Sequence, residues 1–210
     1  MTPPAPTVPT LATVATVATV LTVCTGNLCR SPLAAALLAD ALPGAVLPGA
    51  STGSAGTRAP EGATPPRPTL DRARDLGLDL GRHRARQLVE GTLAGTGLVL
   101  AMAREHRRAV VSLVPRVTRV TFTLREFARL SALVDPAQAD DALQGVAPDD
   151  RLRVAVALVA ARRGSGPLVG PEDDDVVDPI GLDAATYDLS TRQIVDAVTL
   201  ASRYLGPDVG

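Results

Sequence analysis

The sequence predicts an α/β fold with a four-stranded parallel sheet flanked by helices, and three observations support this. Short apolar segments rich in Val, Leu and Thr are typical of buried strands. Helical segments separate them, and such alternation favours parallel pairing. A chain of 210 residues is also long enough to bury such a core. The strands are expected at about 16–23, in the stretch that ends near Ser54, at 97–103 and at 117–124.

The helices are expected between and after these strands. The segment "SPLAAALLADAL" predicts the first, with Ser31 as its cap and Pro32 in its first turn. An amphipathic segment at 149–163 predicts another, capped by Asp149 or Asp150. The remaining helices are expected at 69–77, 104–114, 125–134 and 183–205.

The chain is expected to form a single domain over residues 14–210. Residues 1–13 are rich in Pro and Thr and are expected to be a disordered tail. An insertion is expected at about 134–170, with loops at 134–147 and in the acidic stretch 164–175. The insertion either docks a partner or is a surface elaboration without a role.

Composition excludes several classes of protein. A formal net charge of −1 gives no electrostatic footprint for nucleic acid or an acidic membrane. Two cysteines cannot build the disulfide framework of a secreted domain, and their spacing is not that of a zinc site. The N-terminal segment lacks a basic region, and its apolar stretch is too short to span a bilayer. A cytoplasmic protein without a metal or cofactor is therefore expected, while its oligomeric state stays open.

The stretch "VCTGNLCRSP", residues 23–32, connects the first strand to the first helix. Such a loop lies at the carboxyl edge of a parallel sheet, where open α/β folds bind ligands. Its successive backbone N–H groups, at 25–30, can surround an anion at the helix N-terminus. Arg30 adds a planar donor suited to two phosphate oxygens. The loop therefore predicts a site for a phosphate or a similar oxyanion.

A thiol at the head of this loop is predicted to be a nucleophile. Backbone dipoles and a guanidinium favour the thiolate, which lies beneath the bound phosphate in line for phosphoryl transfer. This chemistry makes Cys24 the nucleophile and Arg30 the clamp on substrate and transition state. Ser31 can donate a hydrogen bond to the thiolate and improve it as a leaving group. The alternative is that both cysteines are small buried residues, but the complete string with Gly, Asn and Ser-Pro favours the functional reading.

The sequence resembles the low-molecular-weight protein tyrosine phosphatase family. The string "CTGNLCRSP" carries the likeness almost letter for letter. The resemblance implies the fold of that family and a phosphatase that acts on phosphoprotein through a cysteinyl-phosphate intermediate. It extends to "STGSAGT" (51–57), "HRARQL" (83–88), "LVLAMAREHRRAV" (98–110), "TFTLREFARL" (121–130) and "VVDPIGLDAATY" (176–187).

The resemblance also implies roles for individual residues. Asp178 of "DPIG" corresponds to the general acid that protonates the leaving group and then acts as base on the attacking water. Asn27 braces the loop in a left-handed conformation, within a network that includes Ser31, Ser54 and His83. The implied phosphate-binding residues are Thr25, Gly26, Asn27, Leu28, Cys29 and Arg30.

Other polar residues are open to two interpretations. Cys29 matches the family's second loop cysteine, which can form a reversible disulfide with the nucleophile and shelter it from oxidation; simple packing is the alternative. The carboxylates at 173–175 form either a solvated loop or a cluster that keeps Asp178 protonated by like-charge repulsion. His106 is expected to lie exposed on the surface.

Two departures from the family's pattern concern the substrate. Ile180 stands where family members usually have an aromatic after Asp-Pro, and the loop after Ser54 lacks the aromatic that often forms the other pocket wall. Phosphotyrosine selectivity is therefore open, although phosphatase chemistry is expected. Leu28 is a bulky aliphatic residue at the position where phosphoarginine-selective relatives look to have a smaller Thr. This difference weakens the phosphoarginine alternative without removing it.

Two competing functions remain. An arsenate reductase that passes a disulfide to thioredoxin needs further cysteines downstream, and none follows Cys29. A reductase that uses an external low-molecular-weight thiol remains possible, as does a non-enzymatic phosphate or phosphopeptide binder. By analogy with the family, a phosphoprotein substrate and a bacterial tyrosine kinase are the expected partners.

Overall fold

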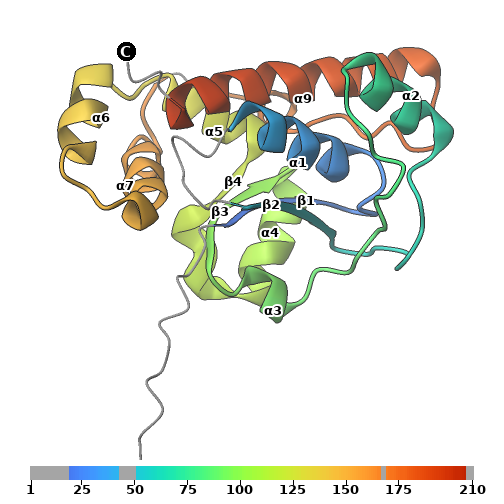
Figure 1. Ribbon diagram of the computed structural model, residues 1–210, viewed down its shortest axis with the longest axis horizontal. Coiled ribbons are helices and arrows are strands. Elements are labelled where there is room, and N and C mark those ends of the chain that lie inside the picture. The colour runs from blue at the N-terminus through green and yellow to red at the C-terminus, as the bar shows by residue number, and fades with distance from the viewer. Residues whose placement is uncertain (1–18, 43–50, 167–168, 207–210) are drawn as a thin grey trace, which may run out of the picture.

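The computed structural model, which describes residues 19–42, 51–166 and 169–206, places four parallel strands in one sheet (Figure 1). The strand order is β2-β1-β3-β4, and each neighbouring pair runs parallel. The predicted fold class is thereby confirmed. The strands are β1 (Thr19–Cys24), β2 (Ser51–Gly56), β3 (Thr96–Ala101) and β4 (Thr121–Thr123).

Helices cover both faces of the sheet, because strand side chains alternate between two cores. Val20 and Cys24 of β1 belong to one core, and Leu21 and Val23 belong to the other. Figure 1 shows α1 and α9 on one side of the sheet and α3 and α4 on the other. The larger core receives side chains from α1 (Arg30–Ala41), α2 (Arg67–Asp75), α5 (Leu124–Ser131), α7 (Pro148–Ala160) and α9 (Ala184–Leu205). The smaller core receives them from α3 (Glu90–Leu93), α4 (Arg104–Leu113) and a 3-10 helix, η1 (Pro115–Val120).

The strand order creates a ligand site at one edge of the sheet. From β1 the chain crosses to β2 on one side, and then returns past β1 to β3 on the other side. The carboxyl ends of β1 and β3 therefore lie where the connections diverge, and open α/β sheets bind ligands at such a point. The loop at 25–29 leaves β1 at this place and enters α1.

Two strand predictions differ from the structure. The strand expected at 16–23 is found at Thr19–Cys24, with 16–18 outside the described residues. The strand expected at 117–124 is wrong in its first half, which is the 3-10 helix η1. The Thr118 hydroxyl donates to the carbonyl of Pro115 (2.6 Å), and the Thr121 hydroxyl donates to that of Val117 (2.7 Å). These local bonds compete with the sheet ladder.

The region expected to be an insertion is largely helical. The loop expected at 134–147 contains α6 (Pro136–Leu143), because the Asp135 side chain caps the backbone N–H of Ala137 (3.0 Å). Neither Asp149 nor Asp150 caps α7, which begins at Pro148 with both carboxylates in its first turn. A short helix, α8 (Pro171–Asp174), interrupts the expected acidic loop.

The segment 134–170 also contributes to the main core. Leu152, Val156 and Val159 of α7 are buried in the same core as Leu98 and Leu100 of β3. We propose that this segment folds together with the sheet as a single domain. The tail expected at 1–13 lies outside the described residues. Among the described helices, none combines the length and the apolar character needed to cross a membrane.

Replacing Leu152 tests whether α7 stabilises the whole fold. Leu152 is 1% exposed, so Leu152→Ala leaves a cavity in the main core and is expected to lower the free energy of unfolding by about 3 kcal/mol. Leu200→Ala is the matched control, because Leu200 lies on α9 and is 43% exposed. This variant is expected to change the free energy of unfolding by less than about 1 kcal/mol. Urea unfolding measures both. Equal small effects, or two separate transitions, would contradict a shared core.

Candidate active site

The candidate site is an open pocket of about 140 Å³ at the carboxyl end of β1. The helix α1 begins at its base, and neither a capping side chain nor an acidic residue occupies the first turn of that helix. The free backbone N–H groups and the helix dipole therefore favour an anion there. The pocket is lined by Cys24, Thr25, Gly26, Leu28, Cys29, Arg30, Asp178 and Ile180.

Cys24 is the last residue of β1, and only 2% of its surface is exposed. Its Sγ atom accepts a hydrogen bond from the backbone N–H of Asn27 (3.2 Å). The hydroxyl of Ser31 lies 3.0 Å from the same sulfur. Donors to sulfur stabilise a thiolate more than a thiol, so this arrangement suits a nucleophile.

Asn27 holds the loop by hydrogen bonds from every polar group of its side chain. It is fully buried, and its φ of 54° lies in the left-handed region that few residues other than glycine adopt. Its Nδ2 donates to Ser31 Oγ (2.9 Å) and to Ser54 Oγ (2.8 Å). Its side-chain Oδ1 accepts from the backbone N–H of Arg86 (3.0 Å). The backbone carbonyl oxygen of Asn27 lies 2.8 Å from Nε2 of His83. The structure therefore brings together the four residues of the expected network, and Arg86 is an additional member.

The loop at 25–29, predicted to bind phosphate and called the phosphate loop, rests on the end of β2. The carbonyls of Cys24 and Thr25 accept from the backbone N–H groups of Thr57 and Arg58, both at 2.9 Å. This close approach requires a glycine at position 56, where a Cβ would lie 2.6 Å from the Thr25 carbonyl oxygen. Sequence reasoning missed Gly56, because only the tertiary contact distinguishes it from other glycines.

Arg30 and Asp178 form an ion pair at the mouth of the pocket. The guanidinium of Arg30 is 4% exposed; it donates to Asp178 Oδ2 at 2.5 Å and to the carbonyl of Val176 at 3.2 Å. Asp178 is half-exposed and also accepts from the backbone N–H of Ile180 (3.2 Å). The structure therefore places the two residues, 148 positions apart in sequence, in direct contact beside Cys24.

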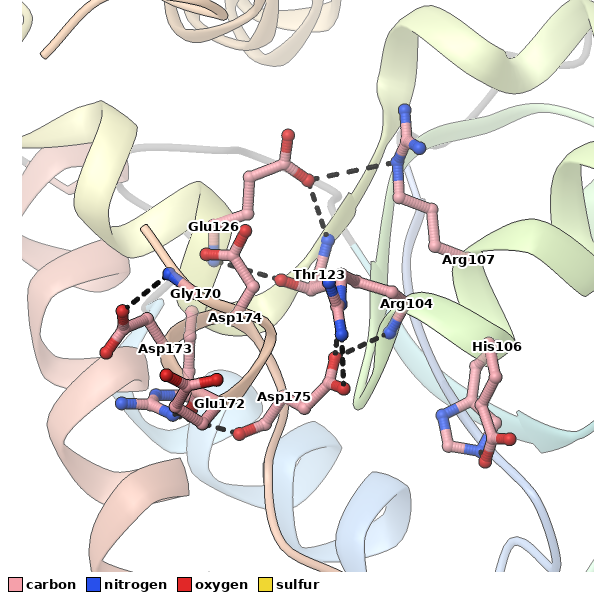
Figure 2. A network of polar contacts seen from close by, with 12 residues as sticks. Arg104, His106, Arg107, Thr123, Glu126, Gly170, Glu172, Asp173, Asp174 and Asp175 are labelled. Atoms are coloured by element: carbon pink, nitrogen blue, oxygen red, sulfur yellow. Dashed lines mark hydrogen bonds and ion pairs between the residues drawn. The ribbon is translucent and has the colours of Figure 1, made fainter. Parts of the chain in front are cut away.

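The segment that leads to Asp178 is anchored by its acidic residues (Figure 2). Asp175 accepts from the backbone N–H of Arg104 (2.8 Å) and caps α4 from a distance, because the residue before that helix supplies no side-chain cap. Asp174 pairs with Arg129 (3.1 Å), and Asp173 accepts from the N–H of Gly170 (2.9 Å). Each of the three carboxylates therefore has its own partner: Asp173 lies exposed and bonds within the segment, whereas Asp174 and Asp175 contact α5 and α4.

His106 lies inside the protein, and the expectation of an exposed surface residue is wrong. It is 2% exposed on the first turn of α4, and its Nε2 atom lies 2.8 Å from the hydroxyl of Thr25. Burial, reinforced by the charge of Arg30, lowers the pKa of His106 to about 4. The signal was present in sequence, because His106 and Val110 are four positions apart and share the inward face of the helix.

Cys29 ends the loop immediately before α1, and both cysteine thiols are free. It is 7% exposed, and burial raises the pKa of its thiol, with Thr69 and Tyr187 beside it. The neutral thiol is therefore favoured at Cys29. Within the described part of the chain, no group of His, Cys, Asp or Glu is arranged to hold a metal ion.

A comparison with family models identifies the family of this chain. Residues 19–146 match the model described as low molecular weight phosphotyrosine protein phosphatase. The chain belongs to this family. It is therefore a phosphatase, and the matched residues include the complete loop from Cys24 to Arg30. Asp178 lies beyond the matched residues, so its place in the candidate site rests on its contact with Arg30.

Solved structures of phosphatases share this fold. The YwlE arginine phosphatase from Geobacillus stearothermophilus is 26% identical, over 89% of this chain and 91% of its own, with a TM-score of 0.62. A low molecular weight protein tyrosine phosphatase from T. tengcongensis is 28% identical, over 87% and 96%, with a TM-score of 0.60. The tyrosine phosphatase Wzb from Escherichia coli K30 shares the fold at 20% identity, over 90% and 98%, with a TM-score of 0.60. Comparison with curated proteins gives no significant match.

Gly56→Ala tests the support beneath the phosphate loop. The added methyl group collides with the Thr25 carbonyl, so the loop must shift, and kcat/KM is expected to fall on the order of a hundredfold. Gly91→Ala is the control, because a Cβ there meets no atom within 4 Å. Hydrolysis of an aryl phosphate measures both variants. Full activity in Gly56→Ala would show that the loop does not depend on this contact.

The buried histidine predicts a pH dependence of stability. Because the pKa of His106 is about 4 in the folded protein and near 6.5 when unfolded, only the unfolded state binds this proton between those values. Protonation of His106 therefore does not affect the stability of the folded state above pH 6.5, and it destabilises the folded state increasingly as the pH falls towards 4. Between pH 7 and pH 5 the loss is expected to be about 2 kcal/mol. Urea unfolding at both pH values should show this loss in the wild type but not in His106→Gln; equal losses in the two proteins would contradict the assignment.

Proposed function

We propose that this phosphatase hydrolyses protein phosphomonoesters of the phosphotyrosine type through a phosphorylated Cys24, without a metal ion. One observation carries the proposal: the Cys24 thiol and the Arg30–Asp178 pair line one pocket at the N-terminus of α1. A nucleophile, an anion clamp and a proton donor are the groups that transfer of a phosphoryl group from oxygen requires.

In the first step the substrate phosphate binds to the loop N–H groups and to the guanidinium of Arg30. The anion competes with Asp178 for this guanidinium, because Nη2 of Arg30 donates to the carboxylate. The Cys24 thiolate forms the S–P bond while the P–O bond to the substrate breaks. Asp178, in its protonated form, gives its proton to the leaving oxygen.

In the second step water hydrolyses the phosphocysteine. The Asp178 carboxylate takes a proton from the water as the new P–O bond forms and the S–P bond breaks. Orthophosphate and the Cys24 thiolate are released, and Asp178 is again protonated. Ser31 and the Asn27 N–H stabilise the departing thiolate, because both lie within hydrogen-bond distance of its sulfur.

The walls of the pocket bear on the choice of substrate. Leu28 and Ile180 line it, and Ile180 is 49% exposed. Aliphatic walls accept an aromatic ring by apolar contact but provide no aromatic stacking. Phosphoarginine is the second candidate substrate, because these walls lack the aromatic slot and one similar structure is that of an arginine phosphatase.

Other functions fit the site less well. A thiol-dependent arsenate reductase releases no alcohol and so does not need a carboxylic acid to protonate one. This site has such an acid, because Asp178 contacts Arg30. A phosphate or phosphopeptide binder needs no nucleophile with donors at its sulfur. By analogy with the family we further propose a cytoplasmic setting and a tyrosine kinase as the partner that phosphorylates the substrate.

Leaving-group dependence tests the roles of Cys24 and Asp178. Cys24→Ser is expected to abolish hydrolysis of p-nitrophenyl phosphate, measured without metal. Asp178→Asn is expected to lower kcat/KM, which reports transfer to Cys24, by about a hundredfold or more on phenyl phosphate but much less on p-nitrophenyl phosphate, because p-nitrophenolate leaves without a proton. Asp188→Asn is the control and is expected to keep the wild-type activity. Asp188 lies exposed on α9, where it pairs with Arg72 of α2.

The outcomes separate the candidate functions. An equal loss of kcat/KM on both esters in Asp178→Asn would contradict the general-acid role. Comparing a phosphotyrosine peptide with phosphoarginine in the wild type distinguishes the two substrate classes. Arsenate reduction with a supplied thiol but no ester hydrolysis would identify a reductase, and silence in both assays would identify a binding protein.

A further inference from the structure

The first turn of α4 contacts both loops that meet at the active site. His106 contacts Thr25 of the phosphate loop at 2.8 Å. Two positions earlier, Arg104 donates its backbone N–H to Asp175, in the segment that leads to Asp178 (Figure 2). The helix itself is fixed to β4, because Nε of Arg107 donates to the carbonyl of Thr121 (3.1 Å). One helical turn therefore connects the nucleophile's loop to the proton donor's loop.

The hydrogen bond between His106 and Thr25 has a definite direction. Nδ1 of the imidazole is buried and has no hydrogen-bond partner among the described residues. A buried N–H without an acceptor is costlier than a buried lone pair, so the proton belongs on Nε2. Oε1 of Glu105 lies 3.3 Å from Nε2 and favours the same tautomer. His106 is therefore the donor and the Thr25 hydroxyl the acceptor.

A neutral donor suits the charges that face this ring. Arg30 and Arg58 face it with positive charge, and Asp175 and Glu105 face it with negative charge. A carboxylate at position 106 would attract Arg30 and compete with a bound phosphate, whereas a cation would repel that arginine. The buried neutral imidazole contributes a hydrogen bond without a net charge.

Thr25 is the loop residue immediately after Cys24, and it is held from two sides. Its carbonyl accepts from the N–H of Arg58 (2.9 Å), and its hydroxyl accepts from His106. We propose that His106 is a positioning residue for catalysis: it holds Thr25 through Nε2 and so keeps the loop N–H groups directed at the phosphate. This inference rests on the proposed phosphatase mechanism, in which those groups bind substrate.

A double-mutant cycle tests the proposal. His106→Phe and Thr25→Val each remove one partner of this hydrogen bond, and each is expected to lower kcat/KM on p-nitrophenyl phosphate and weaken inorganic phosphate binding about five- to tenfold. The double variant removes both partners, so its loss is expected to be no greater than the larger single loss. His106→Gln is expected to recover most of the activity, because its amide N–H can donate where Nε2 does.

The control separates positioning from general stability. Thr121→Val removes a buried hydroxyl that donates to Val117 and does not line the pocket, and it is expected to lower the unfolding midpoint without changing kcat/KM or the Kd for phosphate. Additive losses in the cycle, or an unchanged Kd for phosphate in His106→Phe, would overturn the proposal. Calorimetric phosphate binding requires no turnover. If the wild type binds phosphate but hydrolyses no ester, the proposed function fails while the phosphate affinities still decide the role of His106.

Discussion

The structure of the active site depends on one buried asparagine in a left-handed conformation. Asn27 turns the chain between the end of β1 and the start of α1, with a φ of 54°. Such a conformation costs about 1 kcal/mol for a residue other than glycine. Hydrogen bonds to Ser31, Ser54 and the Arg86 backbone offset this cost and leave the Asn27 N–H directed at the Cys24 sulfur. The turn that exposes the loop amides also provides a donor to the nucleophile.

The charges around this turn are arranged to leave the pocket positive. The first turn of α1 contains no acidic residue, and Arg30 is buried at its start. Asp178 is the carboxylate that contacts Arg30 in the part of the chain the structure describes, and it is half-exposed. The neighbouring carboxylates Asp174 and Asp175 are turned away to Arg129 and Arg104. These two negative charges are therefore paired elsewhere, whereas Asp178 lines the pocket beside Cys24.

Much of the fold and the centre of the site could be predicted from sequence, because the signals are local. The string from Cys24 to Pro32 contains the predicted nucleophile, the predicted clamp and the start of a helix, although Ser31 lies inside that helix and does not cap it. The helix expected at 183–205 is found at Ala184–Leu205. The strand expected at 117–124 was wrong in its first half, because β-branched residues suit both a strand and a short helix, and the Thr118 and Thr121 hydroxyls favoured the helix. Residues that act through tertiary contact were harder to find. The partner of His106, Thr25, is 81 positions away in sequence, and nothing near Gly56 signals its contact with Thr25.

The central claim is that Cys24 carries the phosphoryl group during turnover. The most direct measurement is mass spectrometry of Asp178→Asn quenched in acid during hydrolysis of p-nitrophenyl phosphate, because loss of the general base slows the second step and allows the intermediate to accumulate. We expect the mass of one added phosphoryl group, located on the peptide that contains Cys24 and absent from Cys24→Ala, Asp178→Asn. Burst release of p-nitrophenolate with the phosphoryl group on another residue, or turnover by a protein that lacks Cys24, would contradict the mechanism.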